Sequence, residues 1–177
     1  MGVHPAEEMP FLVAWTDGIG QPGFVESFEA FHRQQREEWR PERWQLLLGV
    51  WCGDELVGCQ GLHAEEFAER GTAESGSWLG QRFQRQGYGT EMRTAVLALL
   101  FDGLGGVAAT SGAIDGNLAS ARVSEKLGYL VTGEDTVAPR GYPVRAQRFR
   151  LERADWRPPC PVEIDGLEPC LPLFGAG

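Results

Sequence analysis

The amino-acid sequence predicts an α/β domain built on a mixed β-sheet, on the basis of three observations. Several short segments alternate apolar and polar residues, or are brief apolar runs bounded by turn residues, as β-strands are. Longer segments carry apolar residues at the spacing of an amphipathic helix. These helical and strand-like segments alternate along the chain, which is the order expected of an α/β protein.

The first half of the chain is expected to contain one helix followed by three strands. An irregular segment, residues 1–24, precedes a predicted helix over about residues 26–39, where aromatic residues recur on one side. Residues 44–62 read as a hairpin whose two strands are joined by a Cys-Gly-Asp turn. Residues 72–80, TAESGSWLG, predict a third strand that leads into a glycine-containing turn.

The second half is expected to alternate helices with strands. The predicted helices span residues 88–101 and 118–127, and the predicted strands span residues 105–113, 129–137 and 144–153. Asn117 is a suitable N-cap for the second of these helices. Gly128 is a suitable end for it, because glycine accepts the left-handed backbone that commonly follows a helix.

Composition and charge exclude several classes of protein. With 177 residues, of which 42% are hydrophobic and 23% charged, the chain can form one domain with its own core. The net charge of −9 argues against a nucleic-acid-binding protein and against a basic membrane-surface protein. No apolar run approaches the ~20 residues that cross a bilayer. We therefore expect neither nucleic-acid nor membrane partners.

The four cysteines are expected to be free thiols. None forms a Cys-x-x-Cys pair and none has a histidine at the spacing of metal ligands, so no metal site is expected. The sequence shows no signal peptide. These features predict a protein of the reducing cytoplasm.

The chain divides into a domain and a tail. Residues 1–156 are expected to form the domain, and residues 157–177 a tail rich in proline and glycine. Large apolar residues persist in this tail at Val162, Ile164, Leu167, Leu171, Leu173 and Phe174. A free linker would not need them, so we expect the tail to pack on the domain or on a partner, as in a homodimer.

The turn before the predicted helix at residues 88–101 is a candidate anion site. Gly87 and Gly89 stand where that helix begins, although glycine costs about 1 kcal/mol per helical position relative to alanine. The first turn of a helix has free N–H groups and the positive end of the dipole, and glycine lets a phosphate approach them. Basic residues are expected around the turn: Arg82, Arg85 and Arg93 beside it, and Arg122 and Lys126 on the next helix. The alternative is a tight turn surrounded by solvated arginines.

Two motifs together indicate the ligand. The dinucleotide pattern G-x-G-x-x-G fails because residue 92 is Met, and no Gly-Lys-Ser/Thr of a Walker motif follows. The pattern Q/R-x-x-G-x-G/A does match, at Gln84, Gly87 and Gly89, and NLASARVSEKLGY follows at residues 117–129. In this order, the motifs resemble the GNAT superfamily of acyl-CoA-dependent N-acyltransferases, over about residues 44–151. AESGSWLG and GYGTEM are most similar to the branch that contains the ribosomal-protein N-terminal acetyltransferases.

The resemblance implies a fold and a ligand. The fold is α/β (α+β), with a mixed, mostly antiparallel central sheet, a splayed parallel strand pair and flanking helices. The ligand is acetyl-CoA or CoA, with succinyl-CoA as another donor that would use the same loop, and no metal is implied. The resemblance assigns CoA binding to Trp78, Leu79, Gln84, Arg85, Gln86, Gly87, Tyr88, Gly89, Thr90, Asn117, Ser120 and Arg122.

The resemblance also implies an activity. An acetyl or other short acyl group would pass from acyl-CoA to a primary amine, small-molecule or peptide, by direct attack in a ternary complex. Glu74 is the candidate base and Ser120 the candidate proton donor or thiol-binding hydroxyl. The alternative is that neither residue is catalytic, with Glu74 an ordinary residue of a strand and Ser120 an ordinary residue of a helix. His63 is a weaker alternative base, and His32 is expected near the acceptor. The alternative function is a non-catalytic CoA-binding or regulatory module.

Two departures from the family pattern affect these expectations. Many members carry a tyrosine acid at the position of Ser124. The family also opens with a strand and a helix before the region that here begins GVHPAEEMPF. The first strand is therefore expected to be absent or atypical, or to be supplied by another segment such as the tail.

Overall fold

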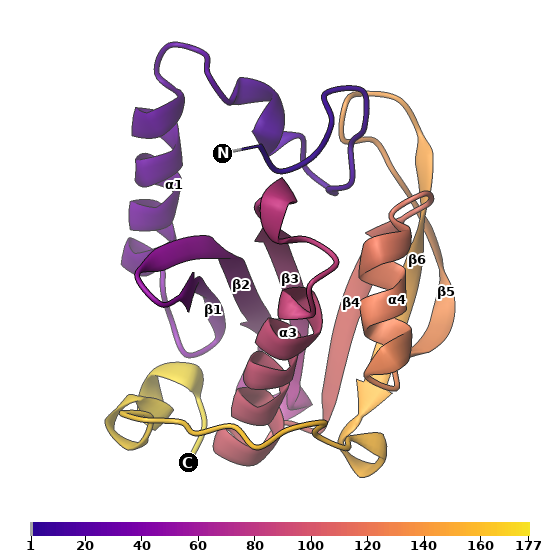
Figure 1. Cartoon of the computed structure of the whole chain (residues 1–177). Coiled ribbons are helices and arrows are strands. Elements are labelled where there is room, and N and C mark those ends of the chain that lie inside the picture. Colours follow the sequence, from indigo (N-terminus) through magenta and orange to yellow (C-terminus); the bar gives the residue numbers. More distant parts are fainter. Residues whose placement is uncertain (1) are drawn as a thin grey trace.

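The computed structural model describes residues 2–177 and contains a six-stranded sheet (Figure 1). The strands are β1 (Arg43–Cys52), β2 (Glu55–Glu65), β3 (Thr72–Leu79), β4 (Ala108–Ile114), β5 (Leu130–Val137) and β6 (Val144–Glu152). They lie in the order β1-β2-β3-β4-β6-β5. Neighbouring strands are antiparallel except for β3 and β4, which are parallel. The predicted fold class is confirmed.

Helices flank this sheet, and residues at their N-termini determine where two of them begin. The α-helices are α1 (Phe24–Glu37), α2 (Phe67–Arg70), α3 (Tyr88–Ala98) and α4 (Leu118–Lys126), and α3 continues as a π-helical turn, η3 (Leu99–Gly103). The 3-10 turns are η1 (Trp15–Gly18), η2 (Gln81–Phe83), η4 (Arg153–Asp155) and η5 (Glu168–Phe174). Gly87 precedes α3 with a left-handed backbone, and the side chain of Asn117 caps α4.

β4 begins three residues later than the apolar pattern predicts, at Ala108. Gly105 adopts a φ of 72°, and the N–H group of Gly106 donates to the Leu100 carbonyl oxygen at 2.8 Å. These two glycines therefore turn the chain out of η3 before the strand can start.

The parallel pair β3–β4 is splayed. Its register contains only Thr72 with Ala108, Ala73 with Ala109, and Glu74 with Thr110. Beyond Glu74 and Thr110 the two strands no longer pair with each other, although each keeps its antiparallel neighbour on the other side. The sheet thus opens between β3 and β4 toward the end where the glycine turn lies, as Figure 1 shows.

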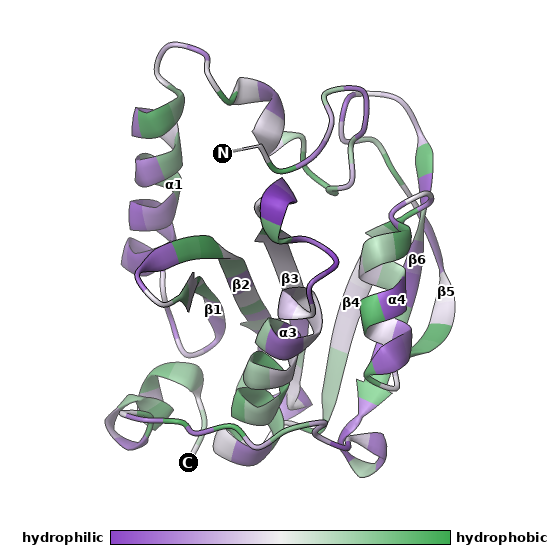
Figure 2. Cartoon of the chain, viewed as in Figure 1, coloured by the Kyte–Doolittle hydropathy of each residue, from purple (hydrophilic) through white to green (hydrophobic). Residues whose placement is uncertain are grey.

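The apolar core lies between the sheet and the helices that cover it. Leu97 of α3, Phe101 of η3 and Phe149 of β6 are each 1% exposed or less. Figure 2 shows α3 as largely apolar and the loop that precedes it as strongly hydrophilic. Burial of α3 therefore fixes the glycine turn at the edge of the core, with its preceding loop in water.

The tail packs on its own chain. Phe174 is 5% exposed, and its ring packs edge-on against Trp44 and Trp39, with centroids 5.0 and 5.2 Å away. The indole nitrogens of Trp39 and Trp44 donate to the carbonyl oxygens of Leu173 and Phe174, at 2.7 and 3.2 Å. Among the described residues, neither this tail nor the chain before β1 contains a strand, so nothing here takes the place of the first strand.

Candidate active site

The glycine turn between β3 and α3 has the backbone of an anion-binding site. Arg85 and Gly87 both adopt left-handed backbones, with φ of 61° and 97°. Gly87 is the N-cap of α3, so the first free N–H groups of that helix follow it directly. A Cβ atom at position 87 would meet no atom within 4 Å, so the space over the turn is open. Such a turn ahead of a helix presents converging N–H donors that suit a phosphate.

Positive charge lies beside this turn, although not all of it is available. Arg82 forms an ion pair with Glu55. Arg85 and Arg122 are exposed, and no carboxylate of the described chain lies within ion-pair distance of either. Lys126 of α4 is likewise exposed and has no ion-pair partner in the described chain, so Arg85, Arg122 and Lys126 are the charges left to attract an anion.

The two glutamines of the loop before α3 stabilise it through hydrogen bonds to backbone carbonyl groups. Gln84 Nε2 donates to the carbonyl oxygens of Val3 and Leu79, at 2.8 and 3.1 Å. Gln86 Nε2 donates to the carbonyl oxygen of Arg82 at 2.6 Å. Both side chains thus fix the loop that carries the turn, and Gln84 ties it to the N-terminal segment.

The first turn of α3 packs between β3 and α4. A Cβ atom added to Gly89 would lie 3.7 Å from Leu79 Cδ1 and 3.6 Å from Val123 Cγ2. The ring of Trp78, next to Leu79, packs 5.8 Å from that of Trp15. The small residue at 89 therefore lets β3, α3 and α4 converge beside the open part of the sheet.

Two further residues of this first turn have local partners. The hydroxyl group of Tyr88 lies 3.2 Å from Cys52 Sγ, and this hydrogen bond raises the pKa of Tyr88. Thr90 is half-buried, and its carbonyl oxygen accepts from Thr94 Oγ1 at 2.9 Å.

Asn117 holds the start of α4 and also contacts the N-terminal segment. Its Oδ1 accepts from the backbone N–H of Ser120 at 3.1 Å, which is the N-cap interaction expected from the sequence. Its Nδ2 donates to the carbonyl oxygen of Pro10 at 3.0 Å. The Ser120 side chain, in contrast, is half-buried and makes no hydrogen bond within the described chain. The cap therefore fixes the position of Ser120 and leaves its hydroxyl group unused.

Glu74 and His63 come together on neighbouring strands. They are paired residues of β3 and β2, and Glu74 Oε2 lies 3.7 Å from His63 Nε2. Their side chains are 39% and 50% exposed, so water reaches both. His63 also lines a hollow of about 250 Å³, together with Gln35, Glu38, Arg43, Trp44, Gln45, Ala64 and Glu65. The two candidate bases thus form one pair at the rim of a cavity.

His32 packs among aromatic rings of α1. Its imidazole packs edge-on against Phe28 and Phe31, with ring centroids 4.5 and 5.4 Å away. Burial lowers the pKa of His32, and the positive charge of Arg36 acts in the same direction. It is therefore neutral at physiological pH and packs as an aromatic residue.

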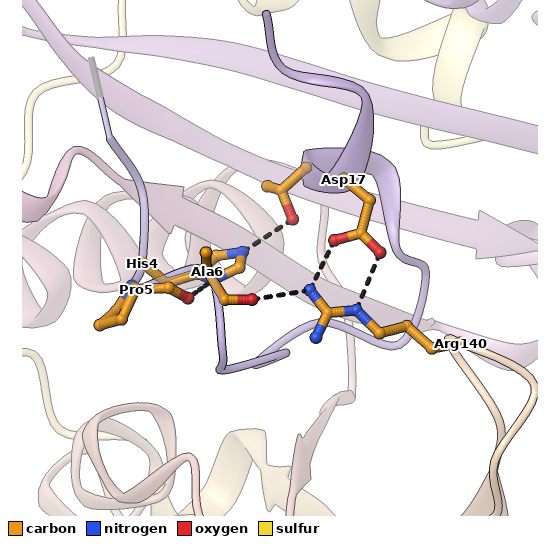
Figure 3. A network of polar contacts seen from close by, with 6 residues as sticks. His4, Pro5, Ala6, Asp17 and Arg140 are labelled. Carbon is orange, nitrogen blue, oxygen red and sulfur yellow. Dashed lines mark hydrogen bonds and ion pairs between the residues drawn. The ribbon is translucent and has the colours of Figure 1, made fainter. Parts of the chain in front are cut away.

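The N-terminal strap, residues 2–18, closes one side of the site, and Figure 3 shows how it is fixed. Arg140, in the turn between β5 and β6, donates to both carboxylate oxygens of Asp17 at 2.6 and 2.8 Å, and to the carbonyl oxygen of Ala6 at 3.2 Å. His4 Nε2 lies 2.7 Å from Thr16 Oγ1. The Arg140 guanidinium lowers the pKa of Asp17 below its usual range. The strap thus joins the glycine loop, the start of α4 and the β5–β6 turn.

Arg93 occupies a different place from the one that the sequence suggests. Its predicted position beside the glycine turn is wrong, because its side chain is 3% exposed and reaches β4 and α4 instead. Its Nη1 donates to Ser111 Oγ of β4 at 3.2 Å and to Ser124 Oγ of α4 at 3.0 Å. Helical spacing places residue 93 one turn after Gly89, on the face of α3 that packs inward.

A buried polar cluster completes this arrangement, namely Ser75, Arg93, Ser111, Ser124 and Tyr129. Ser75 Oγ donates to the carbonyl oxygen of Thr110 at 3.3 Å, and Ser111 Oγ donates to that of Ser75 at 3.3 Å. The Tyr129 hydroxyl lies 3.3 Å from Ser75 Oγ. The two serines are the first residues beyond the last β3–β4 pair, so the cluster lies where the strands begin to separate.

Sequence reasoning missed the strap and the cluster for different reasons. The strap contacts the site through backbone carbonyl groups, which leave no pattern of side chains in the sequence. The cluster unites residues of β3, α3, β4 and α4 with Tyr129. Its one sequence signal is an arginine on the inward-facing side of an apolar helix.

Comparisons with known proteins agree with this geometry. A family model described as an acetyltransferase (GNAT) domain matches residues 12–130, which is more than half of the chain. The chain therefore belongs to the GNAT acetyltransferase family. The resemblance drawn from the two motifs is confirmed.

Solved structures of GNAT acetyltransferases share the fold at low sequence identity. RimJ of Mycobacterium smegmatis, solved with CoA-disulfide, has a TM-score of 0.67 at 17% identity, over 76% of this chain and 66% of RimJ. Spermidine N-acetyltransferase of Vibrio cholerae, solved with CoA and spermine, has a TM-score of 0.61 at 15% identity, over 75% and 76%. A GNAT-family acetyltransferase of Bacillus anthracis has a TM-score of 0.61 at 18% identity, over 73% and 75%.

Two features are absent from the part of the chain that the structure describes. No helix within residues 2–177 is both long enough and apolar enough to cross a membrane. In the same residues, no three His, Cys, Asp or Glu side chains are grouped so that they could hold a metal ion.

Proposed function

We propose that the protein transfers an acetyl or other short acyl group from acyl-CoA to a primary amine, by direct attack of the amine in a ternary complex. The observation that carries this proposal is the opening between β3 and β4, which begins after the Glu74–Thr110 pair and lies beside the glycine turn. Backbone N–H groups that no neighbouring strand uses can polarise a carbonyl group. An opening of this kind next to a phosphate site suits a thioester on a long phosphorylated arm.

The residues around the turn fit CoA. The open space over Gly87 and the exposed Arg85 and Arg122 suit its phosphates. Bound acyl-CoA supplies an activated carbonyl group and a thiolate leaving group. We assign its binding to the end of β3, the glycine turn, the first turn of α3 and the start of α4, namely Trp78, Leu79, Gln84, Arg85, Gln86, Gly87, Tyr88, Gly89, Thr90, Asn117, Ser120 and Arg122.

Glu74 and His63 are placed to handle the proton of the amine. A free amine whose pKa is about 8–10 is mostly protonated at neutral pH, so a base or a water path must take its proton before it attacks. The Glu74 carboxylate is part-exposed, which allows direct or water-mediated contact, and His63 lies 3.7 Å away. We propose Glu74 as the base, with His63 orienting its carboxylate.

Ser120 is placed to meet the sulfur side of the thioester. Asn117 fixes the backbone of Ser120 at the first turn of α4, and the Ser120 hydroxyl has no hydrogen-bond partner in the described chain. An unused hydroxyl at a rigid position can donate to a departing sulfur atom. We propose this role for Ser120 because Ser124, at the tyrosine position, is fully buried.

The acceptor is proposed to be a small-molecule or peptide amine that enters from the side of Glu74 and His63. The adjoining hollow carries the carboxylates of Glu38 and Glu65, which suit an ammonium group before it loses its proton. The spermidine N-acetyltransferase solved in complex with CoA and spermine is a precedent for a protein of this fold that binds both CoA and an amine.

Thermal unfolding with CoA tests the ligand. At a CoA concentration 100 times Kd, binding stabilises the folded state by about 2.7 kcal/mol. The melting temperature of a chain of this size should then rise by several degrees. Gly87→Val should abolish the rise, because its side chain would occupy the open space over the turn. Gly105→Val is the matched control, since Gly105 also has positive φ and open space but lies at the far end of α3.

Release of free thiol from acetyl-CoA with a panel of amines tests the activity. Thiol release that depends on both the amine and the enzyme supports the proposal. A CoA-dependent rise in melting temperature without thiol release for any amine would favour a non-catalytic CoA-binding module. The absence of any rise with millimolar CoA would overturn the proposal.

A further inference from the structure

The Arg93 guanidinium is a buried charge without a countercharge. Its side chain is 3% exposed, and no carboxylate of the described chain lies within ion-pair distance. Its Nη1 meets only neutral hydroxyl groups, those of Ser111 and Ser124, and its Nε is buried with no hydrogen-bond partner in the described chain. Arginine nevertheless stays protonated in proteins, so the positive charge remains.

Such an arrangement is unfavourable for the folded protein on its own. Buried charges are normally paired, because transfer out of water costs far more than a few hydroxyl hydrogen bonds return. Burial lowers the pKa of Arg93, because removal from water destabilises the charged form of its guanidinium group. A neutral side chain of similar length could join Ser111 and Ser124 without this cost. The charge therefore points to a negative group that is present at some stage of function.

The position of Arg93 indicates where that negative group would be. Arg93 lies one helical turn beyond Gly89, and its side chain reaches Ser111, the first residue of β4 past the last β3–β4 pair. It thus lies between the phosphate site and the narrow end of the opening. This inference rests on the proposed function, in which the acyl-CoA arm runs from the glycine turn into that opening.

We propose that Arg93 stabilises the negative charge that develops on the CoA sulfur during acyl transfer. The amine nitrogen forms a bond to the thioester carbonyl carbon, and the carbon–sulfur bond breaks with its electron pair left on sulfur. The surplus proton of the amine passes to Glu74, directly or through water. The sulfur remains a thiolate beside the buried cation until it takes a proton from water, either directly or through the Ser120 hydroxyl group, which regains its own proton from water.

Arg93 acts as a positioning residue through the cluster as well as through its charge. By donating to Ser124 and Ser111 it fixes both hydroxyl groups, and for the Ser124 proton no acceptor is found in the described chain. That O–H group, held by Arg93, is free to point toward the opening. The effect of a fixed cation is large here because Arg93 is buried and its charge is little screened by water.

The pKa of the bound CoA thiol distinguishes this role from a merely structural one. A cation within about 4–6 Å lowers the pKa of an acid by about 1–3 units. The thiol of CoA bound to the wild-type protein should therefore ionise at lower pH than free CoA, as followed by the ultraviolet absorbance of the thiolate. Tyr129 is the titratable group that acts on Arg93, and its own pKa is raised by burial. Tyr129→Phe should leave the shift in place.

Arg93→Met and Arg93→Lys complete the test. Arg93→Met removes the charge and should return the pKa of the bound thiol to that of free CoA, while Arg93→Lys should keep most of the shift. In Arg93→Met, the affinity for CoA should fall most at pH values above the thiol pKa, because the ionised thiolate then lacks its cation. With acetyl-CoA, whose sulfur carries no charge, KM should change little and kcat should fall by about 10²-fold, as for loss of one preorganised donor.

The outcomes separate this inference from the proposed function. Bound CoA with an unshifted thiol pKa in the wild-type protein would overturn the role of Arg93 alone. Failure of the wild-type protein to bind CoA would overturn both. If Arg93→Met does not fold, the role of Arg93 can still be contradicted, either by an unshifted thiol pKa in the wild-type protein or by loss of the shift in Arg93→Lys.

Discussion

His63 and Glu74 face each other across β2 and β3, with 3.7 Å between Nε2 of the imidazole and Oε2 of the carboxylate. Antiparallel pairing places the two residues opposite each other and on the same face of the sheet. His63 also lines the neighbouring hollow, and Glu74 is the last residue of β3 that pairs with β4. The pair therefore lies between the hollow and the start of the sheet opening. A change at either residue should therefore alter the handling of the amine proton.

Replacement of Glu74 by Gln should lower kcat at least about tenfold, since general-base help is typically worth about 10²–10⁴ in rate. A rise in pH should partly restore the rate, because more of the amine is then already neutral. His63→Gln is the matched variant, and it should have a smaller effect because it leaves the carboxylate in place. The measurement is the pH dependence of kcat with the best amine of the panel. Full kcat in both variants would show that water and the backbone suffice.

Replacement of Ser120 by Ala should lower kcat by about tenfold or more, with little change in the affinity for acyl-CoA. Its backbone N–H, rather than its hydroxyl group, meets the Asn117 cap, so the fold should not be disturbed. Asn117→Ala tests the cap itself and should cost about 1 kcal/mol of stability. Calorimetric binding and melting curves separate the two effects. A Ser120→Ala variant with unchanged kcat would remove Ser120 from the chemistry.

Replacement of Phe174 by Ala should destabilise the protein by about 3–5 kcal/mol, because a buried aromatic ring is lost from its contacts with Trp39 and Trp44. In a chain of this size this corresponds to a fall in melting temperature of about 10 °C. Leu173→Ala is the control, since Leu173 is 53% exposed and should change little. Removal of residues 158–177 should act in the same direction, and sedimentation will show whether it also changes the oligomeric state. An unchanged melting temperature in the Phe174 variant would contradict the packing of the tail.

Acidification should loosen the strap through Asp17. Because the folded-state pKa of Asp17 lies below its usual value, its ion pair with Arg140 stabilises the strap above the unfolded pKa, about 3.9. This stabilisation is lost as the pH falls through the lowered folded-state pKa. Limited proteolysis at decreasing pH should therefore cut the strap increasingly, whereas Asp17→Asn should be cut readily already at neutral pH. Equal cleavage of the two proteins at neutral pH would show that the pair does not hold the strap.

Local elements of this protein were predictable from its sequence. The hairpin β1–β2, the helix after Gly87 and the cap at Asn117 depend on neighbours within a few residues. Glycine supplies a left-handed backbone and asparagine an acceptor for a free N–H group wherever the rest of the chain lies. For the same reason, the two short motifs were enough to indicate the family.

The tertiary structure alone decided which distant groups meet. His63 and Glu74 became one pair because of the register between β2 and β3, which no local pattern specifies. Arginine is rarely buried, so the sequence favours a solvated Arg93, yet packing of α3 against β4 and α4 carries it inside. The sequence by itself thus determined the turn that suits a phosphate. Only packing and strand register decided which charges lie beside the opening, because these depend on contacts between residues far apart in the chain.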